Sequence, residues 1–294
     1  MLACTDALRY KDPVRPMLFI GCLLAVAGQG PTAWGQAPSP PRVRLRHVHT
    51  IVVDPGHGGD NTGCMGYHGV YEKFVTLPIA EAVAETLRRR TDAEVLLTRQ
   101  ADVAMDLDAR VAFAAEHDAN LFVSIHLNAA PRPEAHGVET FFLATGAASR
   151  DAAALVAREQ GSALPWGIGA RDARHRIAEV IARDLQRQAD HSLSERLAHH
   201  VQRALARALG TPDRGVKQAP FAVLRGTPCP AIVVEVGFLT HPEEGRALMR
   251  PRWHARIADA IAKAIVAYDR SLPAVAPPRS DASSVPMRSK ASRR

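Results

Sequence analysis

The sequence predicts an α/β fold: a single domain with a mostly parallel central sheet, helices on both faces of that sheet, and an additional helical insertion. Short apolar runs rich in β-branched residues alternate with longer amphipathic stretches from about residue 49 to 143, as in repeated strand–helix units. From Ala147 to Leu209 this alternation gives way to long Ala- and Arg-rich stretches with helical spacing. The 294 residues, 47% hydrophobic and 23% charged, suffice for one large core or two modest ones.

The first half of the domain contains the regular alternation. Residues 51–53 are three β-branched residues that predict a short buried strand, which ends where Pro55 and Gly56 follow. The later elements expected here are a helix over 72–90, a strand over 94–98, a helix over 106–117, and strands over 121–125 and 137–143. Because a proline is best tolerated in the first turn of a helix, Pro78 predicts that the regular helix begins late or kinks there.

The second half begins with the helical insertion, which we place over about 147–190. Strands are expected to resume at 221–224 and 231–234, the latter running into Glu235, and a helix over 253–268 closes the domain. The domain boundaries that follow are a Pro/Arg-rich linker at 38–48, one compact domain at 49–270, and a basic tail at 271–294. The tail has no apolar period and is expected to be disordered.

The N-terminal residues 1–37 have the features of an export signal peptide. Three basic residues precede the apolar run 17–28, and small residues near Ala37 offer a cleavage point. The run is too short to span a bilayer comfortably, so we expect a protein exported to the periplasm, without stable membrane insertion after cleavage. An uncleaved anchor, and a secreted or wall-associated protein, are the alternatives. Cleavage leaves two cysteines, Cys64 and Cys229, whose pairing the sequence does not decide.

The charge balance narrows the class of partner. A formal net charge of +7 favours anionic polymers such as nucleic acid, lipid head groups or acidic cell-wall glycan. Only 5% of the residues are aromatic, and no Lys/Arg run is interleaved with Tyr or Phe to form a base-stacking surface. We therefore expect no nucleic-acid partner.

Residues with metal-binding and acid–base chemistry follow three of the predicted strands. His57 lies on a glycine-flanked loop after the first strand, His126 follows the strand 121–125, and Glu235 follows the strand 231–234. The carboxyl ends of parallel strands meet at one edge of a sheet, where ligands bind. A buried carboxylate is costly, so Glu235 is better explained as a functional group than as a packing choice.

Glu72 completes a candidate metal site. Two imidazoles and one carboxylate, here His57, His126 and Glu72, form a ligand set typical of catalytic zinc, with a fourth position left for water. Glu235 beside such a metal can accept a proton from the water as a general base. Taken singly, Glu72 is better explained as an acid at a helix start, where the helix dipole favours it, and His57 as an ordinary loop histidine. The combination of the three residues reverses that preference.

Four separated motifs, in order along the chain, carry a resemblance to a known family. They are DPGHGG at 54–59, GVYEK at 69–73, SIHLNA at 124–129 and VEVGFLTHPEE at 234–244, supported by LTR at 97–99, Leu107 with Arg110, and the segment 214–235. Over about residues 49–268 the chain resembles the zinc-dependent N-acetylmuramoyl-L-alanine amidases that cleave peptidoglycan. One departure is His241, which replaces the Asn more usual at that point.

The resemblance implies zinc on His57, Glu72 and His126, Glu235 as the catalytic acid/base, and Asn128 as a substrate contact. It implies hydrolysis of the amide between N-acetylmuramic acid and L-alanine, in wall remodelling and daughter-cell separation. Two alternatives remain open at this point: a zinc peptidase acting on the peptidoglycan stem peptides, and a non-catalytic peptidoglycan-binding regulator. Product analysis of digested wall separates the two hydrolases.

The insertion at 147–190 resembles, in its position, the inhibitory helix of some cell-separation amidases, which covers the zinc until an activator protein displaces it. The sequence leaves open whether the insertion is such an element or an ordinary pair of surface helices. If it is inhibitory, Glu179 or Asp184 is within reach of the metal, and deletion of 152–188 raises basal hydrolysis.

Overall fold

The computed structural model describes residues 42–144, 149–160 and 177–273, and of 160 and 177–184 it describes the backbone only. The predicted signal peptide and nearly all of the predicted tail lie outside these residues. Within them, the described part of the predicted linker packs on the domain. Leu45 and Val48 are buried in the core, and backbone N–H groups of residues 46–48 donate to the Asp269 carboxylate.

Six described strands form one mixed sheet, mostly parallel as expected. They are β1 (Thr50–Pro55), β2 (Glu94–Leu97), β3 (Leu121–Asn128), β4 (Val138–Leu143), β5 (Asp213–Ala219) and β6 (Ala231–Phe238). Their order across the sheet is β2-β1-β3-β6-β4-β5, and of these neighbours only β4 and β6 are antiparallel. The central strands β1, β3 and β6 are buried on both faces, which is why they consist of nearly continuous apolar runs.

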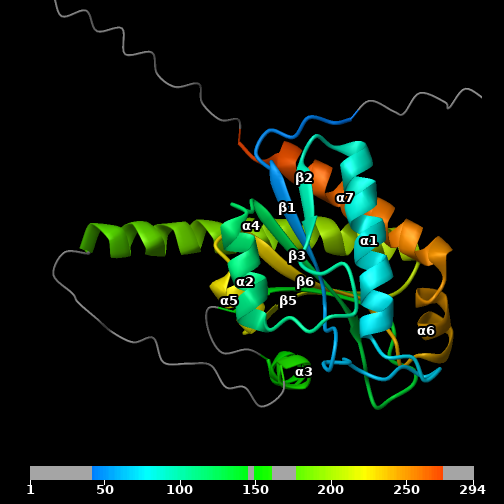
Figure 1. Ribbon diagram of the computed structural model, residues 1–294. Helices are drawn as coiled ribbons and strands as arrows, with labels where there is room; N and C mark the ends of the chain where they lie inside the picture. The colour runs from blue at the N-terminus through cyan, green and yellow to red at the C-terminus, as the bar shows by residue number, and fades with distance from the viewer. Residues whose placement is uncertain (1–41, 145–148, 161–176, 274–294) are drawn as a thin grey trace, which may run out of the picture. The chain divides into compact units, whose positions relative to one another are not determined.

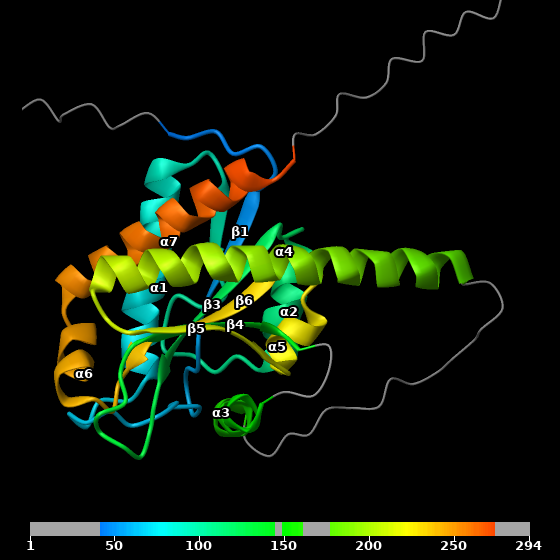
Figure 2. The same ribbon diagram turned by 180° about the vertical axis from the view of Figure 1, so that it is seen from behind.

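Helices cover both faces of the sheet (Figures 1 and 2). On one face, α1 (Lys73–Arg90), α4 (Ile177–Leu209) and α7 (Pro251–Ser271) pack over a large apolar cluster that includes Ile51 and Val123. On the other face, α2 (Leu107–Glu116), α3 (Arg150–Gln160) and α5 (Ala222–Gly226) belong to a second cluster around Val52 and Phe122. The short α6 (Pro242–Leu248) follows β6. No described helix is long and apolar enough to span a bilayer.

The structure corrects the prediction at 221–224. These residues lie in and next to α5, and the strand of this region is β5, which the sequence analysis missed. β5 is an edge strand whose residues are mostly polar and partly exposed, so it has no apolar alternation to reveal it. A four-residue apolar run such as 221–224 is too short for its period to distinguish one turn of helix from a strand.

Helix α1 passes through Pro78 without the expected late start. It begins at Lys73, directly after Glu72, and buries one face through Val75, Ile79 and Val83. An internal proline costs ~3 kcal/mol because it removes one backbone hydrogen bond. Each fully buried Val or Ile contributes ~1.5–3 kcal/mol, so the apolar face outweighs that cost.

Candidate metal centre and active site

The loop after β1 holds His57 in a constrained conformation. The residue has φ of 60°, in the left-handed region that a non-glycine residue rarely adopts, and such strain is typical of functional sites. Two buried arginines keep the loop in place. Arg110 donates to the carbonyl groups of Pro55 and His57, and Arg99 donates to those of Pro55 and Gly56.

The buried carboxylate of Asp54 anchors this bracing. It accepts hydrogen bonds from Arg110, Thr98 and Ser124. Burial alone raises the pKa of Asp54, but the charge of Arg110 and these hydrogen bonds outweigh it and lower the pKa below its ordinary value. Asp54 is therefore ionised and holds the arginine that shapes the His57 loop.

Hydrogen bonds also fix the orientation of two candidate ligands, His57 and Glu72. Nδ1 of His57 lies 2.8 Å from Oδ1 of Asn61, which as an acceptor selects the tautomer that leaves Nε2 free. The carboxylate of Glu72 is fully buried, and it accepts from the backbone N–H of Cys64 at 3.1 Å and of Leu127 at 2.8 Å. Both side chains are thus held before any ligand arrives.

His126 and Glu235 lie side by side on neighbouring strands. They are register partners of β3 and β6, so their side chains leave the sheet on the same face. The sequence analysis placed both residues just after the ends of their strands. In the structure they lie within the strands, which continue to Asn128 and Phe238. The ring of His126 packs against Gly56, where an added Cβ would lie 2.5 Å from the imidazole.

The ligand atoms of these residues converge. Oε1 of Glu72 lies 3.0 Å from Nε2 of His57 and 3.2 Å from Nδ1 of His126. A fourth group, Glu159 of α3, approaches the same point: its Oε2 lies 3.1 Å from Nε2 of His57 and 3.3 Å from Nδ1 of His126. The four candidate ligand atoms all lie within 4.8 Å of one another.

The electrostatic potential at this point is strongly negative. Although burial by itself lowers the pKa of His57, the nearby carboxylates of Glu72 and Glu159 raise it to about 9. The same balance raises the pKa of His126 well above its usual value. Burial raises the pKa of Glu235 well above its usual range, and the charge of Glu159 adds to this.

This environment fits a divalent cation. Nε2 of His57, Nδ1 of His126 and Oε2 of Glu159 are buried and close to one another, yet none of them makes a hydrogen bond of good geometry, although buried polar atoms are normally hydrogen-bonded. Two imidazole nitrogens and carboxylate oxygens are donors that zinc accepts. Both oxygens of Glu235 are also buried and unpartnered, so this carboxylate is free for a water molecule or a substrate.

Comparison with known proteins agrees with the motifs. Residues 51–267 match the family described as N-acetylmuramoyl-L-alanine amidase. The N-acetylmuramoyl-L-alanine amidase AmiA of Escherichia coli (strain K12) is 36% identical over 219 residues, which is 74% of this chain and 75% of AmiA. The chain belongs to this amidase family.

Solved amidases share the fold. The N-acetylmuramoyl-L-alanine amidase of Clostridium difficile 630 superposes with a TM-score of 0.59 and 27% identity, covering 77% of this chain and 100% of that one. The catalytic domain of CwlV from Bacillus (Paenibacillus) polymyxa var. colistinus has a TM-score of 0.57 and 28% sequence identity, and the match covers 75% of this chain and 97% of that one. Our chain is therefore an enzyme that hydrolyses the amide bond between N-acetylmuramic acid and L-alanine in peptidoglycan.

The helical insertion contributes a site residue that the sequence analysis did not identify. Glu179 and Asp184 lie on α4, in a stretch whose side chains are not described, and Glu159 of α3 is the carboxylate of the insertion that reaches the cluster. Its neighbour Arg158 donates to the carbonyl of Ala129 and, at 3.0 Å, to Oδ1 of Asn128. Nothing in the local sequence distinguishes Glu159 from other acids on amphipathic helices.

Asn128 lies beside the cluster, but in this structure it is engaged by protein groups. Its side-chain amide donates to Glu139, which also pairs with Arg214 and Lys217 of β5. Glu139 faces Glu235 across the antiparallel pairing of β4 and β6. This polar network therefore borders the amidase site on the β5 side.

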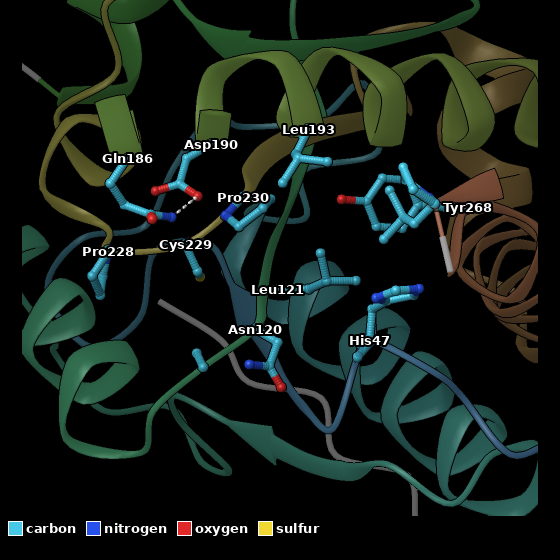
Figure 3. A pocket seen from close by; sticks show the side chains of 14 residues that line it. His47, Asn120, Leu121, Gln186, Asp190, Leu193, Pro228, Cys229, Pro230 and Tyr268 are labelled. Atoms are coloured by element: carbon cyan, nitrogen blue, oxygen red, sulfur yellow. Dashed lines mark hydrogen bonds between the residues drawn. The ribbon is translucent and has the colours of Figure 1, made fainter. Parts of the chain in front are cut away.

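The structure also shows the surroundings of three further residues, His241 and the two cysteines. The ring of His241 caps α6 by accepting from the backbone N–H groups of Glu243 and Glu244, as an Asn side chain would do at a helix start. Cys64 and Cys229 are free thiols. Cys229 lines a pocket of about 390 Å³ that also borders Leu121 and Pro230, at the amino ends of β3 and β6 (Figure 3). That pocket is at the opposite end of these strands from the cluster of His57, Glu72 and His126.

Proposed function

We propose that this amidase is zinc-dependent, with His57, Glu72 and His126 as the metal ligands and Glu235 as the general acid/base. The observation that carries the proposal is the convergence of buried ligand atoms from separate elements of the fold, with the ring nitrogens of His57 and His126 that face Glu72 left without a hydrogen-bond partner. Bound zinc supplies Lewis acidity toward the scissile carbonyl and lowers the pKa of a coordinated water.

The protein groups supply positioning and proton transfer. Asn61 holds the His57 ring, and the N–H groups of Cys64 and Leu127 hold the Glu72 carboxylate. Glu235 accepts a proton from the attacking water on one of its unpartnered oxygens and delivers it to the departing amine of L-alanine. A carboxyl whose pKa is raised by burial suits both halves of this transfer.

The decisive experiment identifies the product. Purified peptidoglycan is digested with the full chain, with and without a chelator, and the fragments are analysed by mass spectrometry. We expect intact stem peptides with a free N-terminal L-alanine, lost on chelation and restored by zinc. Cleavage within the stems would favour the peptidase alternative. Binding without any new terminus, by the full chain and by a Glu159→Ala variant alike, would favour the non-catalytic one.

We further propose that the structure is the inhibited form and that α3 is the inhibitory element. With Glu159 on the cluster and Arg158 on Asn128, α3 occupies the position that a water and a substrate need. Activation then requires a partner protein that displaces α3. The proposed setting is wall remodelling and daughter-cell separation in the periplasm, and the N-terminal signal features are the support for export.

A further inference from the structure

The segment just before α1 leaves an unusual set of apolar side chains exposed. In the described part of the chain six large hydrophobic side chains are exposed, and four of them fall within ten positions: Met65 (57%), Tyr67 (61%), Tyr71 (38%) and Phe74 (54%). We call these four the 65–74 platform. Clustered exposed apolar side chains on a soluble protein mark a binding surface far more often than isolated ones do.

Backbone contacts tie the platform to the segments that bear Glu72 and Glu235. Met65 and Tyr71 face each other across an antiparallel bridge, so their side chains share one face. Next to them, Cys64 and Glu72 are joined by a backbone hydrogen bond of 2.9 Å. The N–H of Tyr67 donates to the carbonyl of Leu239, just after the strand that bears Glu235.

The platform is electrically neutral. None of its four side chains is charged, and the neighbouring cation, Lys73, pairs with Asp102 at 2.7 Å and lies over the ring of Phe74 at 4.7 Å. The β5 side of the site differs, because it is charged: the cationic side chains of Arg214 and Lys217 both pair there with the carboxylate of Glu139. The two sides of the site therefore favour different chemistry.

The substrate has the same division. In uncleaved peptidoglycan the lactyl group of the muramic acid is amidated, so the sugar strand beside the scissile bond is neutral, and its pyranose rings present C–H faces. The stem peptide on the other side of that bond carries carboxylates. Aromatic rings pack well against apolar faces and keep a polar edge for hydroxyl groups, as in Tyr67 and Tyr71.

We infer that the 65–74 platform binds the neutral sugar strand of peptidoglycan next to the scissile amide, an inference that rests on the proposed function of the site. The four side chains are exposed to solvent while Glu159 of α3 lies at the cluster, so the platform is accessible in the proposed inhibited form. The inhibited enzyme can therefore hold its polymer before it is activated.

The test measures sugar binding without catalysis. The full chain is titrated with chitohexaose, a neutral β-1,4-linked N-acetylglucosamine oligomer, in the presence of a chelator. Tyr67→Ala and Phe74→Ala are expected to weaken binding about tenfold each. Tyr67→Phe keeps the ring and loses only the hydroxyl group, so it should bind more tightly than Tyr67→Ala. The matched control is Leu185→Ala, which removes a side chain of similar exposure (60%) on the distant helix α4.

Equal dissociation constants for all variants, or no binding by the unmodified chain, would overturn the inference. So would sedimentation showing that Tyr67→Ala converts a self-associated chain into monomers while sugar binding is unchanged, because the platform would then be a protein interface. As a second readout in a Glu159→Ala background, Tyr67→Ala should reduce hydrolysis of polymeric wall more than that of a short muramoyl peptide. Absence of hydrolysis with sugar binding intact would count against the proposed function and not against the platform.

Discussion

The amidase site is built from two unequal parts. His57, Glu72, His126 and Glu235 come from the sheet and the start of α1, and they are held by buried arginines, backbone N–H groups and strand register. Glu159 comes from α3, which is held by the small apolar contacts of Ala152 and Leu155 and by the hydrogen bonds of Arg158. The first part is held in place as the proposed metal site requires, whereas the second is attached by few interactions, as the proposed displacement of α3 requires.

This difference predicts that substitutions in the first part abolish hydrolysis, whereas substitutions in α3 increase it. The largest expected effect is that of Glu235→Gln, which removes the proton acceptor and keeps the shape. Hydrolysis of purified wall should fall by about 10²- to 10⁴-fold, because general acid/base catalysis contributes on that order. Zinc content, measured on the same preparation, should not change. Full turnover by this variant would exclude Glu235 from the role.

The second effect concerns the bracing under the His57 loop. Asp54→Asn leaves the buried guanidinium of Arg110 without its charge partner, which should lower the free energy of unfolding by ~3 kcal/mol at neutral pH. The folded pKa of Asp54 lies below its ordinary value of 3.8, so its stabilisation is complete above that pH and is lost as the pH falls through the folded pKa.

Denaturant-induced unfolding, measured between pH 3 and pH 7, tests the contribution of the Asp54–Arg110 pair to stability. The difference between the unmodified chain and Asp54→Asn should narrow below about pH 4, the ordinary pKa of an aspartate. The control is Asp259→Asn, which removes a partly exposed carboxylate paired with Arg90 and Lys263 and should change stability by about 1 kcal/mol or less. A constant difference across the whole pH range would contradict the account.

On the α3 side the sign of the effect reverses. Glu159→Ala removes the carboxylate that occupies the cluster, so basal hydrolysis should rise by roughly tenfold, which corresponds to about 1.4 kcal/mol of lost inhibitory contact. The measurement is the initial rate of release of stem peptides from purified wall. The exposed acid Asp151 on the same helix provides the control, since Asp151→Ala should leave the rate unchanged.

The smallest effect is expected for Arg158→Ala. Loss of its hydrogen bonds to Asn128 and Ala129 should weaken the seating of α3 by ~1 kcal/mol, which raises the basal rate about fivefold. Arg150→Ala, at the exposed start of α3, is the matched control. A rate below that of the unmodified chain would show that Arg158 serves the reaction and not the closed form.

The same difference explains what the sequence revealed. His57, Glu72, His126 and Glu235 follow or join apolar runs whose periods are clear, so their convergence at one edge of the sheet could be anticipated. Glu159 could not be anticipated, because its place at the cluster depends on how α3 docks, and docking leaves no local pattern. For the same reason the sequence suggests an inhibitory insertion only from its position in the chain, and it points to Glu179 and Asp184 but not to Glu159.

Some roles depend on contacts in the folded state that the residue types alone do not reveal. The bracing roles of Asp54 and Arg110 depend on contacts between residues 56 positions apart, although the residues themselves lie within recognised motifs. The edge strand β5 was missed because its polar residues reflect exposure and the network around Glu139, not strand periodicity. The sequence thus predicts the elements whose buried residues recur with a clear period. It does not predict the features that depend on how separate elements pack together.

The most direct test of the two-part site is the zinc stoichiometry of purified variants, measured by equilibrium dialysis against a limiting chelator. The account predicts one zinc per chain for the unmodified protein and for Glu159→Ala, because the three sheet-side ligands suffice, and none for His57→Ala. Loss of zinc from Glu159→Ala as complete as from His57→Ala would contradict it, since Glu159 would then be a permanent ligand and α3 a fixed part of the metal site.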